Sequence, residues 1–371
     1  MARLGGDEFA ILIEAAAADG DFGGTVADLA RRILGSVGRA VDVGGTVVVP
    51  ATSIGVAFAE PADAADDVLR HADLALYAAK ARGRNQLAVF DAAMQSAASL
   101  RLQLENDLRR ALQSGSGELG VRFQPVVELA TGRLRAFEAL ARWKHPTLGT
   151  IAPDEFIPIA EESGLIGEVG ALVLYTACRV VARCNALRPD DAPLAVSINV
   201  AAAQLVDPDL PGTVHRSLAR AGLAATALHL EVTEDALVRY PDAARACLNQ
   251  LRQLGVGVAI DDFGTGRSSL GCLHHFPIDT VKIDQSLFEP QDDGELAAIV
   301  RGLLELTTTM GLIAVAEGIE SPEQVERLVR AGCPLGQGHL FAPALDPASA
   351  VAYARWQAPV NRPGREGPRA A

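Results

Sequence analysis

Acidic and amide side chains stand at the ends of several short apolar runs in the C-terminal two-thirds of this 371-residue sequence. A buried carboxylate is costly unless it is paired or bound to a metal ion, so a whole set of them indicates a shared cation site. The residues that end these runs are Glu138, Asn199, Glu231, Glu234, Asp261, Asp262 and Glu317, and two further runs end at Lys282 and Gln337.

The chemistry of this set follows from its ligand atoms. Carboxylate and amide oxygens, without histidine or thiolate, suit Mg²⁺ or Mn²⁺ better than zinc. The adjacent Asp261 and Asp262 can face two cations, and paired divalent ions stabilise both the attacking and the leaving oxygen of phosphodiester hydrolysis. In such a site Lys282 would steady the attacking water and Glu317 would act as general base. Arg142 would bind a phosphate as a fork-shaped donor.

The spacing of these residues indicates the elements that position them. Strand patterns are predicted at 121–127, 135–140, 194–199, 228–232, 256–261, 279–283, 312–316 and 336–341. Helical patterns are predicted at 154–187, 240–254, 295–310 and 321–331. Alternating strands and helices with reactive groups at the strand C-termini favour an α/β fold of the modified (β/α)₈ barrel type. A doubly wound open sheet is the alternative, but it would gather ligands at one switch point.

Composition limits the remaining possibilities. The formal net charge is −13, and the absence of a basic stretch argues against DNA or RNA as a partner. No signal peptide and no apolar run of about 20 residues is recognisable, so we expect a cytoplasmic protein without a membrane segment in this chain. The five cysteines lack CxxC spacing, and we predict that they are reduced and buried rather than redox-active or zinc-bound.

Four segments follow from the patterns along the chain. Residues 1–91 have the pattern of about half an α/β domain. Residues 92–117 carry leucines four apart and end in SGSG, which predicts a linker helix that packs on a domain. The alternative is a helix that forms a dimer or transmits a signal. Residues 118–357 contain the barrel. The tail at 358–371 is rich in Pro, Gly and Arg and is predicted to be disordered.

The motifs around the site residues resemble the EAL family of cyclic di-GMP phosphodiesterases. They are FEALARW (137–143), SINVAAAQL (197–205), LEVTE (230–234), AIDDFGTGRSSLGCL (259–273), FPIDTVKID (276–284), VAEGIE (315–320) and GQGHLF (336–341). The resemblance spans about residues 100–350. It implies a barrel that hydrolyses cyclic di-GMP to linear 5′-pGpG with two Mg²⁺ or Mn²⁺ ions, in bacterial second-messenger signalling. It also implies a homodimer that forms through the barrel.

The resemblance implies a role for each matching position. Glu317, Lys282 and Asp262 are implied as catalytic groups, and Glu234 is implied to hold the DDFGTG loop. The implied metal ligands are Glu138, Asn199, Glu231, Asp261 and Asp262, and the implied substrate contacts are Arg142, Leu140 and Gln337.

Three positions depart from the family pattern, and none of them removes an implied ligand. Arg267 replaces the tyrosine that usually follows DDFGTG, Ala201 replaces a serine, and His339 replaces an aromatic residue. In the family, this loop contacts a dimer partner and helps to shape the metal site. Arg267 therefore puts the regulation of activity by dimer contact in doubt, and leaves the expected chemistry unchanged.

The N-terminal segment resembles the later half of a GGDEF diguanylate cyclase domain, through GGDEF (5–9), SIGVA (53–57) and ADLALYAAKARGRN (72–85). The resemblance implies that Gly5 and Gly6 would approach GTP and that Glu8 would bind metal. The earlier half of such a domain would precede residue 1, as would any sensory or membrane-bound part. We therefore expect a fragment or a misplaced start codon, no cyclase activity, and vestigial roles for Gly5, Gly6, Asp7 and Glu8.

Three functions are compatible with these motifs. The first is an active phosphodiesterase, which is favoured because all acids of the implied metal set are retained. The second is a catalytically silent barrel that binds cyclic di-GMP and signals by contact with a partner. The third is a fragment of a bifunctional diguanylate cyclase and phosphodiesterase.

Overall fold

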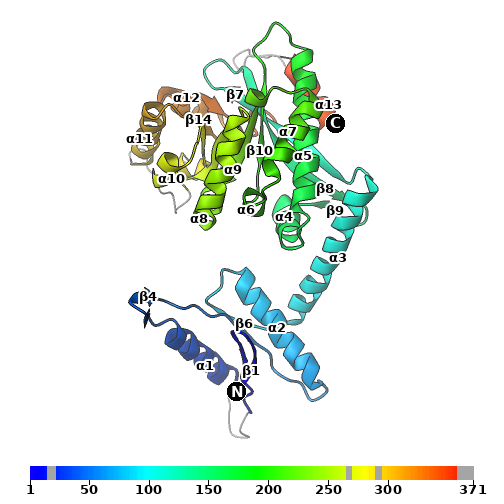
Figure 1. The fold of residues 1–371 in the computed structure, drawn as a ribbon, viewed down its shortest axis with the longest axis vertical. Helices are drawn as coiled ribbons and strands as arrows, with labels where there is room; N and C mark the ends of the chain where they lie inside the picture. Colours follow the sequence, from blue (N-terminus) through cyan, green and yellow to red (C-terminus); the bar gives the residue numbers. More distant parts are fainter. Residues whose placement is uncertain (15–21, 265–269, 289–294, 357–371) are drawn as a thin grey trace. The chain divides into compact units, whose positions relative to one another are not determined.

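The computed structural model describes residues 1–14, 22–264, 270–288 and 295–356 (Figure 1). By its contacts the chain divides into two compact units, Met1–Gln103 and Leu104–Ala371. The predicted disordered tail at 358–371 and the substituted loop position Arg267 lie outside the described residues.

Strands of the N-terminal unit pair only in twos within the described residues. β1 (Ala2–Gly5) pairs antiparallel with β2 (Glu8–Ala10), β3 (Val41–Val43) antiparallel with β4 (Thr46–Val48), and β5 (Ile54–Val56) parallel with β6 (Leu87–Val89). The helices that accompany them are α1 (Phe22–Val37) and α2 (Ala65–Ala81). Helix α2 packs so closely on β5 that a Cβ on Gly55 would come within 2.1 Å of the Ala72 carbonyl oxygen.

The core of this unit is small. Among its described residues the buried apolar side chains are Val26, Ala30, Ala75, Ala79 and Ala88. Large apolar side chains are exposed on its strands and turns, among them those of Leu4, Phe9, Val41, Val43 and Val47. Apolar burial is the main stabilising term of folding, so this unit has far less of it than the barrel.

Amide hydrogen exchange should therefore differ between the two units. Two-stranded sheets are marginally stable without further strands or helix packing, and regions with few buried apolar contacts open at low free-energy cost. We expect the amides of residues 1–90 to exchange faster than those of the barrel strands. Exchange followed by mass spectrometry on the whole chain measures this, and uniformly slow exchange across both units would contradict it.

Helix α3 (Ala92–Ser114) runs from the first unit into the second, as the predicted linker helix does. Its Leu104 and Leu108 are buried in the main core of the second unit. Asp107 accepts a hydrogen bond from His145 Nε2 at 3.1 Å, because His145 Nδ1 accepts the backbone N–H of Leu148. The C-terminal half of the helix is thus fixed to the barrel, and the division between the units falls inside the helix.

Eight strands of the described residues close into a barrel. Around the barrel their order is β8–β10–β11–β12–β13–β14–β15–β7, and β7 returns to β8. β7 runs antiparallel to both of its neighbours, whereas the other barrel pairs are parallel, and this is the modification of the (β/α)₈ pattern. The strands are β7 (Leu119–Glu128), β8 (Leu134–His145), β10 (Ala195–Asn199), β11 (Leu228–Thr233), β12 (Gly257–Phe263), β13 (Thr280–Ile283), β14 (Ile313–Ala316) and β15 (Leu335–Gly336); β9 (Gly149–Ile151) extends β8 as a hairpin.

Helices surround the barrel strands and cover their outer faces (Figure 1). They are α4 (Pro153–Glu162), α5 (Ile166–Ala186), α6 (Ala202–Leu205), α7 (Leu210–Ala221), α8 (Glu234–Arg239), α9 (Pro241–Gln253), α10 (Leu270–His275), α11 (Glu295–Thr309), α12 (Pro322–Arg330) and α13 (Pro347–Arg355), with 3₁₀ turns η1 (Ala225–Ala227) and η2 (Gln285–Leu287). The predicted barrel is confirmed, and its strands and helices lie close to the predicted positions.

Two predicted elements differ from the structure. The helical pattern at 154–187 is broken into α4 and α5 at Gly164, whose φ of +73° is accessible to glycine at little cost. The strand predicted at 336–341 is only Leu335–Gly336. After it the chain turns tightly against Ile319, where a Cβ on Gly338 would lie 2.0 Å from the Ile319 carbonyl oxygen.

Within the described residues, helix α5 is the one helix with the length and apolar composition of a membrane span. Its buried residues include Val173, Ala177 and Val181, which pack into the barrel core beside β10 and α7. Burial in the core is the ordinary reason for such a composition. Two of the five cysteines lie on this helix. All five are free and buried, and the prediction that they are buried is thereby confirmed.

Candidate active site

The structure gathers the predicted polar residues at the carboxyl edge of the barrel. Parallel strands end at a common edge, so residues distant in sequence become neighbours there. Glu138 lies on β8, Asn199 ends β10, Glu231 lies on β11, Asp261 and Asp262 lie on β12, Lys282 lies on β13, and Glu317 and Gln337 follow β14 and β15.

Lys282 lies at the centre of this cluster. Its Nζ is 2.8 Å from Glu231 Oε2, 2.8 Å from Glu317 Oε1, 3.0 Å from Asp261 Oδ1 and 3.4 Å from Glu138 Oε2. The lysine side chain is 3% exposed and that of Glu231 is 2% exposed. One buried ammonium is therefore the shared counter-charge of four carboxylates.

Two amides complete the network around Glu138. Asn199 Nδ2 donates to Glu138 Oε1 at 2.9 Å, and Gln337 Nε2 donates to Glu138 Oε2 at 2.5 Å. Gln337 Nε2 also donates to Glu317 Oε1 at 3.1 Å. The Gln337 Oε1 atom is buried and has no hydrogen-bond partner among the described residues. Such an acceptor fits a site that is completed by a ligand, an ion or water.

The acids of the cluster differ in the direction in which their pKa values are shifted. Burial raises the pKa of Glu231 well above its ordinary value, and burial raises the pKa of Glu317 to about 8. Burial opposes the ionisation of Glu138 too, but attraction to Lys282 and the two amide donors outweigh it and lower its pKa. Burial acts against the charge of Lys282, and the surrounding carboxylates nevertheless raise its pKa well above the usual range.

The donor set fits divalent cations. Carboxylate oxygens of Asp261, Asp262 and Glu317 lie within 4.8 Å of one another. Five carboxylates surround the single ammonium when Asp262 is included. If all are ionised they leave an excess of four negative charges, which is the charge of two divalent ions. Asp262 has a φ of +54°, an uncommon conformation for a residue with a Cβ, and such strain concentrates at functional sites.

Other predicted site residues lie at or near this edge. Glu138, Leu140 and Arg142 alternate along β8, so they share one face of the strand. Arg142 Nη1 donates to the Ala141 carbonyl at 2.8 Å and forms no ion pair with a described residue. Glu234 accepts a hydrogen bond from Cys272 Sγ of α10 at 3.8 Å. The loop that Glu234 is predicted to hold includes 265–269, which lie outside the described residues.

One acidic neighbour of the site was missed by sequence reasoning. Asp284 adds to the negative charge around Asp262 and is among the groups that, after burial and Asp261, raise the pKa of Asp262. Its own carboxylate accepts the Ser286 amide and caps η2. The available signal was its position two residues after Lys282 in TVKID.

The pKa of Glu317 gives a pH-dependent stability. Its folded-state value of about 8 lies above the ordinary 4.5, so between these values the folded protein binds more protons than the unfolded chain. Stability that is present below the ordinary pKa is therefore lost as the pH rises through 8. We expect Glu317 to lower the free energy of unfolding of the metal-free protein by about 2–3 kcal/mol between about pH 6 and about pH 8.5.

Urea unfolding in EDTA at both pH values measures this loss. Glu231 acts in the same direction, so Glu317→Gln should flatten the pH dependence without abolishing it. Mg²⁺ should restore stability more at the higher pH, because its ligands are then deprotonated. An unchanged pH dependence in Glu317→Gln would contradict the assignment.

The N-terminal motif forms a separate feature. Gly5, Gly6, Asp7 and Glu8 lie in the exposed β1–β2 hairpin, and Arg3 donates two hydrogen bonds to the Gly6 carbonyl oxygen, at 2.6 and 2.9 Å. That these residues are vestigial stays a prediction.

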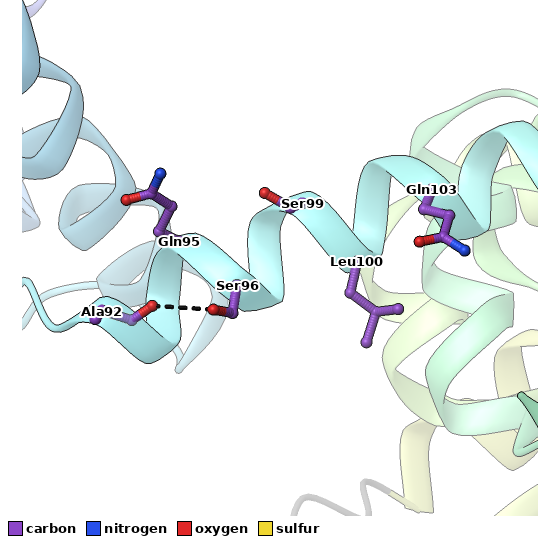
Figure 2. A pocket seen from close by; sticks show the side chains of 6 residues that line it. All are labelled: Ala92, Gln95, Ser96, Ser99, Leu100 and Gln103. Carbon is purple, nitrogen blue, oxygen red and sulfur yellow. Dashed lines mark hydrogen bonds between the residues drawn. The ribbon is translucent and has the colours of Figure 1, made fainter.

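A hollow lies along α3, away from the barrel cluster in sequence (Figure 2). Figure 2 shows that its lining residues, Ala92, Gln95, Ser96, Ser99, Leu100 and Gln103, all come from one face of the helix. None of them carries an ionisable side chain, and Ser96 Oγ bonds the Ala92 carbonyl oxygen of its own helix. This hollow offers no acid–base chemistry, so the barrel cluster is the candidate active site.

Comparisons with known proteins agree with this geometry. The family description "EAL domain" matches residues 105–344, and "Diguanylate cyclase, GGDEF domain" matches residues 1–86. The chain belongs to the EAL domain family and carries a GGDEF-matching segment before the barrel. Both predicted resemblances are thereby confirmed.

Two relatives come from Pseudomonas aeruginosa. The cyclic di-GMP phosphodiesterase NbdA is 36% identical over 96% of this chain and 44% of its own length. The bifunctional diguanylate cyclase/cyclic di-GMP phosphodiesterase MucR is 39% identical over 92% of this chain and 49% of its own length. The chain thus spans about half the length of the curated relatives it matches.

Solved structures show the same barrel. The complex of the MucR phosphodiesterase with cyclic di-GMP is 39% identical, covers 67% of this chain and 99% of its own, and has a TM-score of 0.61. The EAL domain of Mycobacterium smegmatis DcpA is 32% identical, covers 66% of this chain and 99% of its own, and has a TM-score of 0.55.

Proposed function

We propose that this chain is a metal-dependent phosphodiesterase that hydrolyses cyclic di-GMP to linear 5′-pGpG in bacterial second-messenger signalling. The observation that carries the proposal is the cluster of four carboxylates around Lys282 at the carboxyl edge of the barrel. It is supported by NbdA and MucR, whose names state cyclic di-GMP phosphodiesterase activity, and by the MucR structure, which holds cyclic di-GMP.

Oxygen ligands of the cluster would hold two Mg²⁺ or Mn²⁺ ions. Glu138, Asn199, Glu231 and Asp261 would hold one ion, and Asp262 would help to hold the second. Bound there, two such ions supply Lewis-acid activation of water and charge stabilisation at the phosphate. The protein's share is to fix these ligands on rigid strand ends, so that little reorganisation is needed during the reaction.

The remaining residues would handle the proton and the substrate. Glu317 is placed to take the proton of the attacking water, since a carboxylate with a raised pKa is an effective base near neutral pH. Lys282 would orient that water through its Nζ donors, which also stabilise negative charge. Arg142, Leu140 and Gln337 are the proposed contacts to the dinucleotide. The Gln337 amide also keeps Glu138 and Glu317 in a fixed relation.

Location and assembly belong to the same proposal. A cytoplasmic site of action is supported by five buried free thiols, which suit a reducing compartment. A homodimer through the barrel is supported by the family resemblance, and sedimentation at several concentrations measures it. The N-terminal unit is not proposed to make cyclic di-GMP.

One assay separates the candidate functions. The chain is incubated with cyclic di-GMP and Mg²⁺, and the products are separated by chromatography; a parallel sample contains EDTA. Linear 5′-pGpG that forms only with the metal supports the proposal. Binding of cyclic di-GMP without product would instead identify a silent receptor. Cyclic di-GMP formed from GTP in a third sample would identify a bifunctional enzyme.

A further inference from the structure

A second arginine lies on the substrate-facing side of the barrel. Arg122 is on β7, opposite Leu140 of the antiparallel strand β8. Two residues deeper, Gln124 lies opposite Glu138. Directly opposite residues of an antiparallel pair project from the same face, and so do alternate residues of one strand. Arg122 therefore projects from the same face as Glu138 and Arg142.

The height of Arg122 in the barrel follows from the register. Leu140, its partner, is two residues beyond Glu138 toward the carboxyl edge, a rise of about 7 Å. The neighbours Val121 and Phe123 point the other way and are buried in the core, whereas Arg122 is exposed. Its side chain thus starts one step above the acid cluster, on the open side.

Arg122 and Arg142 are close enough to repel each other. Burial is the main cause that lowers the pKa of Arg142, and repulsion by Arg122 adds to it. Among the described residues, no hydrogen bond or ion pair engages the Arg122 guanidinium, and Arg142 donates only to the Ala141 carbonyl. Attraction to Glu138 acts on Arg142 in the opposite direction to the repulsion by Arg122. Neither arginine forms an ion pair with a described residue, so an anion that joins the two guanidinium groups would relieve their repulsion and gain fork-shaped hydrogen bonds.

Asp346, an acidic group on which Arg122 acts electrostatically, does not fill this role. Arg122 contributes least among the named causes that lower the pKa of Asp346. The Asp346 carboxylate is already used, because it accepts the backbone N–H groups of Ala348 and Ser349 and the Ser349 hydroxyl at the start of α13.

We propose that Arg122 is a further substrate-binding residue, which with Arg142 clamps the anionic phosphodiester part of cyclic di-GMP above the acid cluster. This inference rests on the proposed function. The clamp would supply the positive charge that an anionic substrate needs at the mouth of an acidic site. It would act on binding, since neither guanidinium lies among the groups that contact the proposed water.

Steady-state kinetics of the Arg122→Gln variant test the clamp, and the Arg135→Gln variant serves as the control. Arg135 is the matched control: it is an exposed arginine near the start of β8, at the opposite edge, where it pairs with Glu128. We expect Arg122→Gln to raise the KM for cyclic di-GMP about tenfold with little change in kcat. Raising the salt from about 50 mM to about 500 mM should raise the KM of the wild type more than that of Arg122→Gln. The KM of Arg122→Lys should lie between that of the wild type and that of Arg122→Gln.

Binding in a Glu317→Gln background separates this inference from the proposed function. Calorimetry with cyclic di-GMP and Mg²⁺ should show about tenfold weaker binding when Arg122→Gln is added. An unchanged Kd or KM in Arg122→Gln would overturn the clamp even if the wild type hydrolyses the substrate. A wild-type protein that binds cyclic di-GMP without hydrolysing it would overturn the proposed phosphodiesterase activity. The comparison of binding constants would still show whether Arg122 contacts the ligand. Thermal melting should show equal stability for both arginine variants, because both positions are exposed.

Discussion

Glu138→Ala should abolish hydrolysis of cyclic di-GMP, with a loss of at least about a thousandfold in kcat. Glu138 is the acid to which both amides of the site donate, and its pKa is lowered, so it is ionised at neutral pH. Removing it takes away a proposed metal ligand, leaves the Asn199 amide without its acceptor and leaves the Gln337 amide with Glu317 alone. Initial rates of 5′-pGpG formation with saturating Mg²⁺ measure the effect.

The stability of this variant should move little in the absence of metal. The Glu138 charge is one of the causes that raise the pKa of Glu231 and Glu317, so its removal relieves repulsion while it costs two hydrogen bonds. Glu138→Gln keeps the shape and removes only the charge, and it should be as inactive as the alanine variant.

Glu128→Ala is the matched control for Glu138→Ala. Glu128 ends β7 at the opposite edge of the barrel and pairs with Arg135. This control should retain wild-type turnover. Wild-type rates in Glu138→Ala would refute the metal assignment.

Lys282→Met should destabilise the metal-free protein strongly. Four carboxylate oxygens lie within 3.4 Å of the Lys282 Nζ, and deleting one partner of a buried ion cluster leaves the others uncompensated. We expect the free energy of unfolding at about pH 8 to fall by about 3–5 kcal/mol. The fall should be smaller at about pH 5, where the acids with raised pKa values accept protons instead. Urea unfolding in EDTA at both pH values measures this difference.

Mg²⁺ should recover part of the stability of Lys282→Met, because the divalent ion replaces the missing positive charge. Turnover should still fall by at least about a hundredfold, since the ammonium that orients water and stabilises negative charge is gone. Lys80→Met, at an exposed position of α2, is the control that should leave turnover and the stability of the barrel unchanged. A metal-free Lys282→Met protein as stable as the wild type at about pH 8 would contradict the central role of this lysine.

Much of the fold could be predicted because its signals are local. Strand and helix periodicity depends on neighbouring residues, and the linker helix occupies Ala92–Ser114 within the predicted 92–117. The failures lie where distant contacts override the local pattern. The residues after Gly336 were predicted as a strand, but the chain there packs its backbone against Ile319. The break between α4 and α5 depends on one positive φ at Gly164.

The sequence by itself determined which chemical groups the site contains: oxygen ligands, one lysine and an arginine, on or just after the predicted strands. Only the tertiary structure decided which of them meet. Lys282 reaches Glu231 across 51 residues, and Gln337 reaches Glu138 across 199 residues. Contacts of this kind depend on barrel closure, and the pairing of Arg122 with Leu140 depends on the antiparallel β7. Neither follows from spacing along the chain, because closure and strand direction are set by the packing of the whole barrel.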